Sequence, residues 1–223
     1  MGYVEVIKKV RDEGRKTLSE YESKQVLKEF GIPIIEEYYI EKFEQIYQIS
    51  KLKYPIVAKG VARTITHKTE KNLVRLWIKD EDELKKEFSD LISTEGVEGV
   101  LLSTQITDMR EFLLGLKYDK QFGYTIIFGL GGIFTEVLKD ISIRICPITE
   151  GDAKEMMSEI RSSRLLGSIR GYPPVNIKML SDMMINLSKL SETIDDISEV
   201  DINPVMFEKG NPVAVDALVV LKD

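Results

Sequence analysis

Hydrophobic residues recur along this chain at two spacings, one typical of helices and one typical of strands. Apolar residues three positions apart predict a helix over residues 4–13, which Gly14 ends. Ser19 and Glu22 form a capping box, which predicts a second helix that Gly31 ends. Further helices are predicted over residues 44–52, 82–93, 150–160 and 175–190.

Short runs rich in β-branched and aromatic residues predict strands between these helices. They cover residues 34–40, 56–59, 73–78, 99–102, 111–116, 125–128, 133–138, 141–145, 197–207 and 213–217. Lys139-Asp140 is short enough to join two of these strands as a hairpin, and the consecutive strands indicate an antiparallel region. The sequence therefore predicts an α/β protein in which residues 103–107 connect two lobes, 1–105 and 106–223.

Size and charge limit the classes of partner. The 223 residues suffice for one large or two small domains. A formal net charge of −6 argues against nucleic acid or an anionic membrane as the main partner, because phosphate surfaces require a basic face. With Cys146 as the only cysteine, no leader sequence and no membrane-spanning run, we expect a soluble, cytoplasmic protein in a reducing compartment.

A glycine-rich stretch follows the strand over residues 125–128. Gly129, Gly131 and Gly132 permit positive φ angles and let backbone N–H groups face a ligand, which favours an anion site. The alternative is that these glycines only turn the chain.

Three further places carry residues suited to phosphate chemistry. Lys59 ends an apolar strand, where an anion would compensate its charge. His67, the only histidine, lies in a basic loop; it excludes a multi-histidine zinc site but suits a general base or a nucleophile, or else is a surface residue. Asp201, Asn203 and Asp216 offer the oxygen ligands that Mg²⁺ prefers, although turn formation and solvated acids explain them equally.

Eight phrases in this order resemble the ATP-grasp β subunit of the ADP-forming acyl-CoA synthetases, a family that includes acetyl-CoA synthetase (ADP-forming) and is related to succinyl-CoA synthetase. The phrases cover residues 18–33, 54–59, 66–69, 119–123, 128–147, 171–174, 201–204 and 214–217. The resemblance implies an ATP-grasp fold, in which two α+β lobes clasp ATP or ADP with Mg²⁺.

The same resemblance implies a role for each matching residue. Lys59 contacts nucleotide phosphates, Lys24 faces the same cleft, and the hinge that meets adenine is formed by Ser103, Thr104, Gln105 and Ile106. Asn203 and Asp216 hold Mg²⁺, with Asp201 in support. The phosphoryl group is received by Gly129, Gly131, Gly132 and Arg144, and His67 is phosphorylated.

The expected partner is a CoA-binding α subunit in an α2β2 complex, which handles acyl phosphate and CoA. The implied reaction converts acyl-CoA, ADP and phosphate into carboxylate, CoA and ATP. Two departures from the family leave an alternative, a catalytically impaired nucleotide-sensing or structural subunit. Thr104 replaces the usual hinge acid, and Lys71-Asn72-Leu73 replaces a glycine pair.

Overall fold

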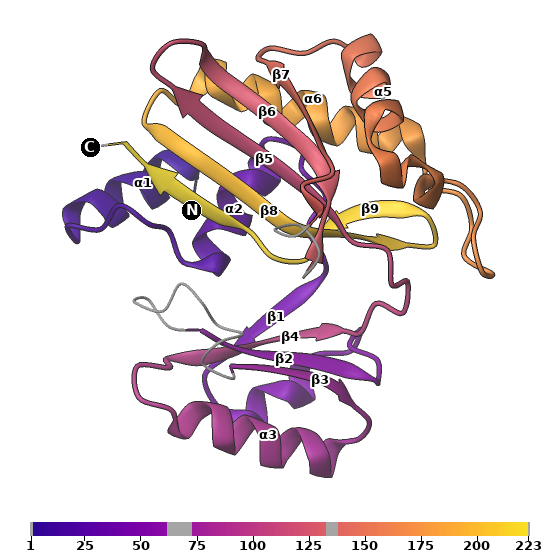
Figure 1. Ribbon diagram of the computed structural model, residues 1–223. Helices are drawn as coiled ribbons and strands as arrows, with labels where there is room; N and C mark the ends of the chain where they lie inside the picture. The colour runs from indigo at the N-terminus through magenta and orange to yellow at the C-terminus, as the bar shows by residue number, and fades with distance from the viewer. Residues whose placement is uncertain (1, 62–72, 133–137, 223) are drawn as a thin grey trace. The chain divides into compact units, whose positions relative to one another are not determined.

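The computed structural model describes residues 2–61, 73–132 and 138–222. The chain forms two compact units, one of Met1–Ile34 with Asp108–Asp223 and the other of Ile35–Thr107 (Figure 1). The sequence-based division groups residues 1–34 with the other lobe, whereas their apolar side chains lie in the core of the larger unit.

An antiparallel sheet forms the centre of the larger unit. Its strands are β5 (Phe112–Asp119), β6 (Gly123–Leu130), β7 (Ile141–Ile145), β8 (Ile197–Glu208), β9 (Asn211–Ala214) and β10 (Leu218–Leu221). They lie in the order β10-β8-β5-β6-β7, and β9 pairs with β8. The antiparallel region predicted from the sequence is therefore confirmed.

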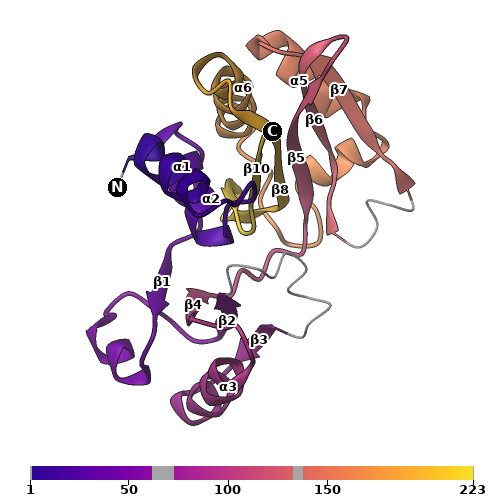
Figure 2. The same ribbon diagram turned by 90° about the vertical axis from the view of Figure 1, so that its left-hand side faces the viewer.

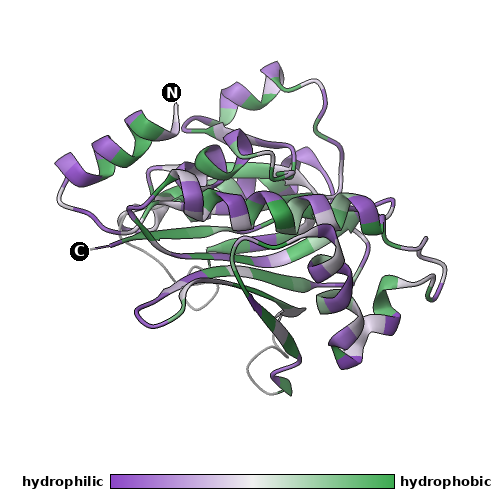
Figure 3. Ribbon diagram, turned by 90° about the horizontal axis from the view of Figure 1, so that it is seen from above, coloured by the Kyte–Doolittle hydropathy of each residue, from purple (hydrophilic) through white to green (hydrophobic). Residues whose placement is uncertain are grey.

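Helices cover one face of this sheet and its β10 side. They are α1 (Tyr3–Asp12), α2 (Glu20–Glu29), α5 (Glu150–Glu159), the 3₁₀ helix η3 (Arg161–Leu166) and α6 (Ile177–Thr193). α6 contacts β5 and β6, α5 contacts β6 and β7, and α2 contacts β10 (Figure 2). The helices carry hydrophobic and hydrophilic residues side by side (Figure 3), and their apolar residues join Phe112, Leu114 and Leu116 in one core.

The smaller unit has a core of its own. Its sheet has the order β1-β4-β2-β3, formed by β1 (Glu37–Ile40), β2 (Ile56–Val61), β3 (Val74–Ile78) and β4 (Gly99–Thr104). α3 (Glu81–Ser93) contacts β2, β3 and β4, and Leu84, Phe88 and Leu91 are its buried residues.

Local signals account for several helix ends. Ser19 Oγ accepts a hydrogen bond from the Glu22 N–H at 3.2 Å, and Glu22 Oε2 accepts one from the Ser19 N–H at 2.9 Å, which confirms the capping box. The helix predicted over residues 44–52 is instead the 3₁₀ helix η1 (Phe43–Gln48), in which no residue is buried. No described helix is long and apolar enough to cross a membrane.

Of the hairpin predicted around Lys139-Asp140, the structure describes the second strand, β7. β7 pairs with β6, so that Ile143 lies opposite Ile127. Most of the strand predicted over residues 133–138 lies outside the described residues, and Leu138 at its end is helical. Ser142 and Arg144 lie on the less exposed side of β7, where both contact Glu159 of α5.

Candidate functional site

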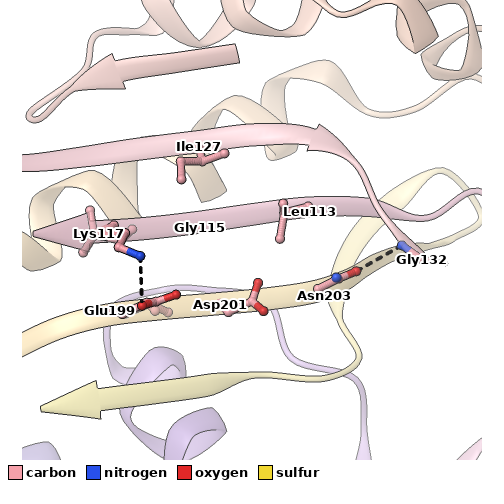
Figure 4. A pocket seen from close by; sticks show the side chains of 10 residues that line it. Leu113, Gly115, Lys117, Ile127, Gly132, Glu199, Asp201 and Asn203 are labelled. Carbon is pink, nitrogen blue, oxygen red and sulfur yellow. Dashed lines mark hydrogen bonds and ion pairs between the residues drawn. The ribbon is translucent and has the colours of Figure 1, made fainter. Parts of the chain in front are cut away.

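The face of the large sheet opposite the core of the larger unit carries a pocket. Side chains alternate along a strand, so Leu114 and Leu116 enter the core while Leu113, Gly115 and Lys117 face the other way. The pocket has a volume of about 560 Å³ and is lined by Leu113, Gly115, Leu116, Lys117, Ile127, Gly132, Glu199, Val200, Asp201 and Asn203 (Figure 4).

At one end of the pocket the glycine-rich loop meets β8. The Gly132 N–H donates a hydrogen bond to Asn203 Oδ1 at 3.1 Å (Figure 4). Gly132 has a φ of 68°, and a Cβ there would lie 2.1 Å from Glu111 Oε2. A Cβ on Gly131 would lie 2.8 Å from the Phe112 carbonyl oxygen. Glycine is therefore required at position 131 by the close approach of the Phe112 backbone, and at position 132 by the positive φ.

Asp201 lies beside Asn203 on the pocket side of β8. Burial, together with the negative charges of Glu199 and Asp216, raises the pKa of Asp201 to about 6. Asp216 is brought to this end of β8 because the Val215 N–H donates to the Pro204 carbonyl at 3.1 Å. A cation bound here would offset the charge that otherwise disfavours ionised Asp201.

The donor set fits a hard cation with few protein ligands. Within the described ranges, no group of three or more histidines, cysteines, aspartates and glutamates is placed to hold a metal. Asp201, Asp216 and the amide oxygen of Asn203 are two carboxylates and one amide. Mg²⁺ fits this set, because it keeps several waters and takes substrate phosphates as its other ligands.

Several lining residues were not predicted from the sequence. Gly115 lies opposite Asp201 in the β5–β8 pairing and opposite Ile127 in the β5–β6 pairing. Lys117 lies 3.5 Å from Glu199 at the end of the pocket away from Asn203 (Figure 4). A glycine inside a strand is a sequence signal for close approach. Lys117 and Ile127 line the pocket because of the register in which their strands pair, and the sequence does not reveal that register.

The guanidinium of Arg144 lies toward α5 rather than in this pocket. It forms an ion pair with Glu159 and a hydrogen bond to Ser142 Oγ at 3.3 Å. The hydrogen bond to Glu159 raises the pKa of Arg144. Arg144 is thus partnered in the described structure, while His67, the other predicted catalytic residue, lies outside the described residues.

The two lysines predicted to face the nucleotide are both buried, one in each unit. Lys24 on α2 is 1 % exposed, and its Nζ lies 2.6 Å from Glu20 Oε1, a carboxylate that is itself buried. Lys59 is 8 % exposed on β2, where it lies opposite Leu101 of β4 and Val74 of β3. Burial of an ammonium group requires a compensating charge or hydrogen bonds.

The predicted hinge begins at the last residues of β4. Ser103 and Ile106 are buried, and the Gln105 N–H donates to the Pro55 carbonyl at 2.9 Å. Thr104, which replaces the usual hinge acid, accepts a hydrogen bond through Oγ1 from the Lys53 N–H at 3.1 Å. The boundary between the two units falls immediately after, between Thr107 and Asp108.

Comparison with known proteins covers nearly the whole chain. The ATP-grasp domain family matches residues 9–221. The β subunit of acetate–CoA ligase [ADP-forming] II from Pyrococcus furiosus is 38 % identical over 98 % of each chain.

Solved structures of an archaeal enzyme have the same fold. Acetyl-coenzyme A synthetase 1 of Ca. Korarchaeum cryptofilum, with coenzyme A and Ca-AMPCP, matches with a TM-score of 0.90 and 31 % identity over 98 % of this chain and 99 % of that chain. A second structure of that enzyme has a TM-score of 0.86 and 31 % identity over 99 % of this chain and 100 % of that chain. It holds coenzyme A and Mg-AMPPCP, and its phosphohistidine segment points towards the nucleotide binding site.

The family match, the identity over almost the full length of both chains and the shared fold agree with one another. This chain belongs to the ATP-grasp family and, within it, to the β subunits of ADP-forming acetate–CoA ligases.

Proposed function

We propose that this chain is the nucleotide-binding β subunit of an ADP-forming acyl-CoA synthetase. It transfers phosphate between a phosphohistidine and ADP, and the complete enzyme reversibly makes ATP, carboxylate and CoA from acyl-CoA, ADP and phosphate. In the transfer step the bond from phosphorus to the imidazole nitrogen breaks as a bond to a terminal ADP oxygen forms. The imidazole keeps the electron pair.

One observation carries this proposal: the likeness to a named β subunit spans 98 % of both chains. The contact between Gly132 and Asn203 supports it, because it joins a glycine-rich loop to an oxygen ligand in one pocket. Phosphoryl transfer requires little more than positioned donors and neutralised oxygens, which backbone amides and a hard cation supply.

We assign the cation to Asn203 and Asp216, with Asp201 beside them. Mg²⁺, when bound, would neutralise the phosphate oxygens of the nucleotide. Lys59, the 103–106 segment and the glycines of the loop are proposed nucleotide contacts, whereas Lys24 and Arg144 pair with Glu20 and Glu159.

Nucleotide binding by the isolated chain tests the metal assignment. Asp216→Ala should weaken Mg-ADP binding by at least about tenfold, since it removes one charged ligand. Lys209→Ala, in the β8–β9 turn, is the control. Calorimetry with and without Mg²⁺ measures both. Equal affinity of Asp216→Ala and the parent would show that Asp216 is not a ligand.

Turnover tests the division of labour between subunits. We propose that a CoA-binding α subunit, in an α2β2 complex, supplies the acyl phosphate and CoA chemistry. The isolated chain should then make no acyl-CoA from acid, CoA and ATP, and activity should appear when the α subunit is added. Full turnover by this chain alone would contradict the proposed function, and the absence of turnover in the complex would favour the impaired-subunit alternative.

A further inference from the structure

Asp140 is a buried residue that lies directly beside the beginning of the glycine-rich loop. Its carbonyl oxygen accepts a hydrogen bond from the Leu130 N–H at 3.0 Å. A Cβ on Gly129 would lie 2.4 Å from the same oxygen, so the two backbones approach closely there. We infer that Asp140 is a positioning residue for phosphoryl transfer, which holds residues 129–132 in the conformation that receives the phosphoryl group.

The carboxylate of Asp140 is fixed at two points by the start of η3. Its Oδ1 accepts a hydrogen bond from the Arg161 N–H at 2.7 Å, and its Oδ2 accepts one from the Ser162 N–H at 2.8 Å. Burial raises the pKa of Asp140, but hydrogen bonds from Ser162 and Arg161 lower it by more, so the carboxyl group is ionised at neutral pH. Hydrogen bonds to an ionised acceptor are about twice as strong as neutral ones. Asp140 therefore joins β6 to η3 firmly, through its main chain and its side chain.

Two neighbours of Asp140 hold β7 against the same part of the helices. Ser142 Oγ donates a hydrogen bond to Glu159 Oε2 at 2.6 Å, and Arg144 forms an ion pair with the same carboxylate. Glu159 is the last residue of α5, two positions before Arg161. Hydrogen bonds fix distance and direction, whereas apolar packing is not directional. These polar contacts therefore set the position of β7 and of Asp140 narrowly.

A short path leads from Asp140 to a proposed cation ligand. The Gly132 N–H, two residues after Leu130, donates to Asn203 Oδ1 at 3.1 Å (Figure 4). Movement of Leu130 would therefore displace the N–H group that contacts Asn203. A misplacement of about 1 Å can lower a reaction rate about 100-fold. The role of Asp140 rests on the proposed function, in which this loop receives phosphate.

The alternative is that Asp140 only stabilises the start of η3. A substitution would then lower the free energy of unfolding and leave the turnover of each folded complex unchanged. A positioning role instead lowers kcat at saturating Mg-ADP. KM for ADP should change little, because ADP lacks the phosphoryl group that the loop receives.

Asp140→Asn tests the role in the complete complex with the α subunit. The amide keeps the size of the carboxylate, but its NH₂ group faces one of the two N–H donors of η3 and cannot accept from it. For ATP formation, kcat should fall at least about tenfold, and KM for ADP should stay within about threefold of the parent. Asp140→Glu keeps the charge on a longer side chain and should also lower kcat, so it decides the question if Asp140→Asn does not fold.

Thr149→Val is the matched control, because Thr149 also satisfies the start of a helix but lies outside the loop. Its Oγ1 accepts from the Asp152 N–H at 3.2 Å. Thr149→Val should lose stability and keep the kcat of the parent, with urea unfolding showing that each variant is folded under the assay conditions. Hydrogen exchange in the isolated chain needs no activity, and the Leu130 amide should exchange faster in Asp140→Asn than in Thr149→Val.

A kcat within about twofold of the parent in the folded Asp140 variant would overturn the inference, as would an equal fall of kcat in Thr149→Val. A raised KM for ADP at unchanged kcat would assign Asp140 to nucleotide binding and overturn it too. Unchanged exchange of the Leu130 amide would contradict the path from Asp140 to the loop. An inactive parent complex contradicts the proposed function itself, and the inference with it.

Discussion

At the scale of single residues, Asp201 makes stability depend on pH. Its pKa of about 6 lies above the ordinary value of 3.8, so the folded chain binds this proton more tightly than the unfolded chain does. The free energy of unfolding should therefore fall as pH rises from about 4 to about 6, by up to about 3 kcal/mol, and stay constant above that window.

Asp201→Asn should remove this fall and leave the variant more stable than the parent at pH 7. Urea unfolding at pH 5 and at pH 7 measures both proteins. Asp195→Asn, whose carboxylate is 97 % exposed, is the control for removing one acid. The same pH slope in Asp201→Asn and in the parent would show that another group titrates.

His67 provides a second prediction at this scale, because it is the only histidine of the chain. If it carries phosphate, incubation with γ-labelled ATP and Mg²⁺ should give an acid-labile, base-stable adduct. His67→Asn should abolish the adduct and turnover with the α subunit while leaving nucleotide binding nearly intact. Turnover without any adduct would instead mean that phosphate passes directly from the partner's histidine to ADP.

The sequence predicted residue types at the site better than it predicted their partners. The sequence singles out Asn203 as a ligand type and Gly132 as a loop glycine, but it does not show that they form a hydrogen bond although they lie 71 positions apart. Arg144 stands out equally, yet Glu159 holds it toward α5. Strand register and helix packing decide which basic side chain forms an ion pair with which acidic one, and no local sequence pattern predicts either.

At the scale of elements, Arg110 holds residues 165–173, a segment that follows α5, in place by hydrogen bonds. Its guanidinium pairs with Asp108 at 2.6 Å and donates to the carbonyls of Leu165, Gly167 and Pro173 at 2.8–3.0 Å. Arg110 is 4 % exposed, and its guanidinium lies 5.2 Å from the Phe207 ring centroid. One buried side chain thus satisfies three carbonyls of an irregular segment.

Arg110→Met should destabilise the chain by about 3–5 kcal/mol, since it leaves Asp108 as a buried charge without its guanidinium. Lys178→Met removes a surface ion pair with Asp182 and should cost less than about 1 kcal/mol. Chemical unfolding measures both. Hydrogen exchange at residues 165–173 should also accelerate in Arg110→Met, and unchanged protection there would contradict the fastening role.

Elements were predictable where local chemistry decides them. The Ser19–Glu22 capping box lies within one turn, so its sequence signal is complete. Residues 43–48 have helical spacing but become a 3₁₀ helix with no buried residue, because only Phe43 and Ile46 among them pack against the small core. Ile141–Ile145 is a strand as predicted, and it pairs with β6.

At the scale of the whole molecule, the part of the chain that the structure describes has two hydrophobic cores. One contains Leu114 and the other contains Leu102, and both leucines are fully buried. Among the described residues, ten buried ones form the smaller core, which supplies less stabilisation from burial than the larger core does. Trp77, the only tryptophan of the sequence, lies on β3 of the smaller unit, so its fluorescence follows the unfolding of that unit.

Matched leucine truncations should therefore act on different unfolding transitions. Leu102→Ala should cost about 2–5 kcal/mol and move the tryptophan fluorescence transition to lower urea. Leu114→Ala should cost a similar amount, measured by far-ultraviolet circular dichroism, and leave the fluorescence midpoint where it is in the parent. If Leu114→Ala moves the fluorescence midpoint as far as Leu102→Ala does, the two cores unfold as one cooperative unit.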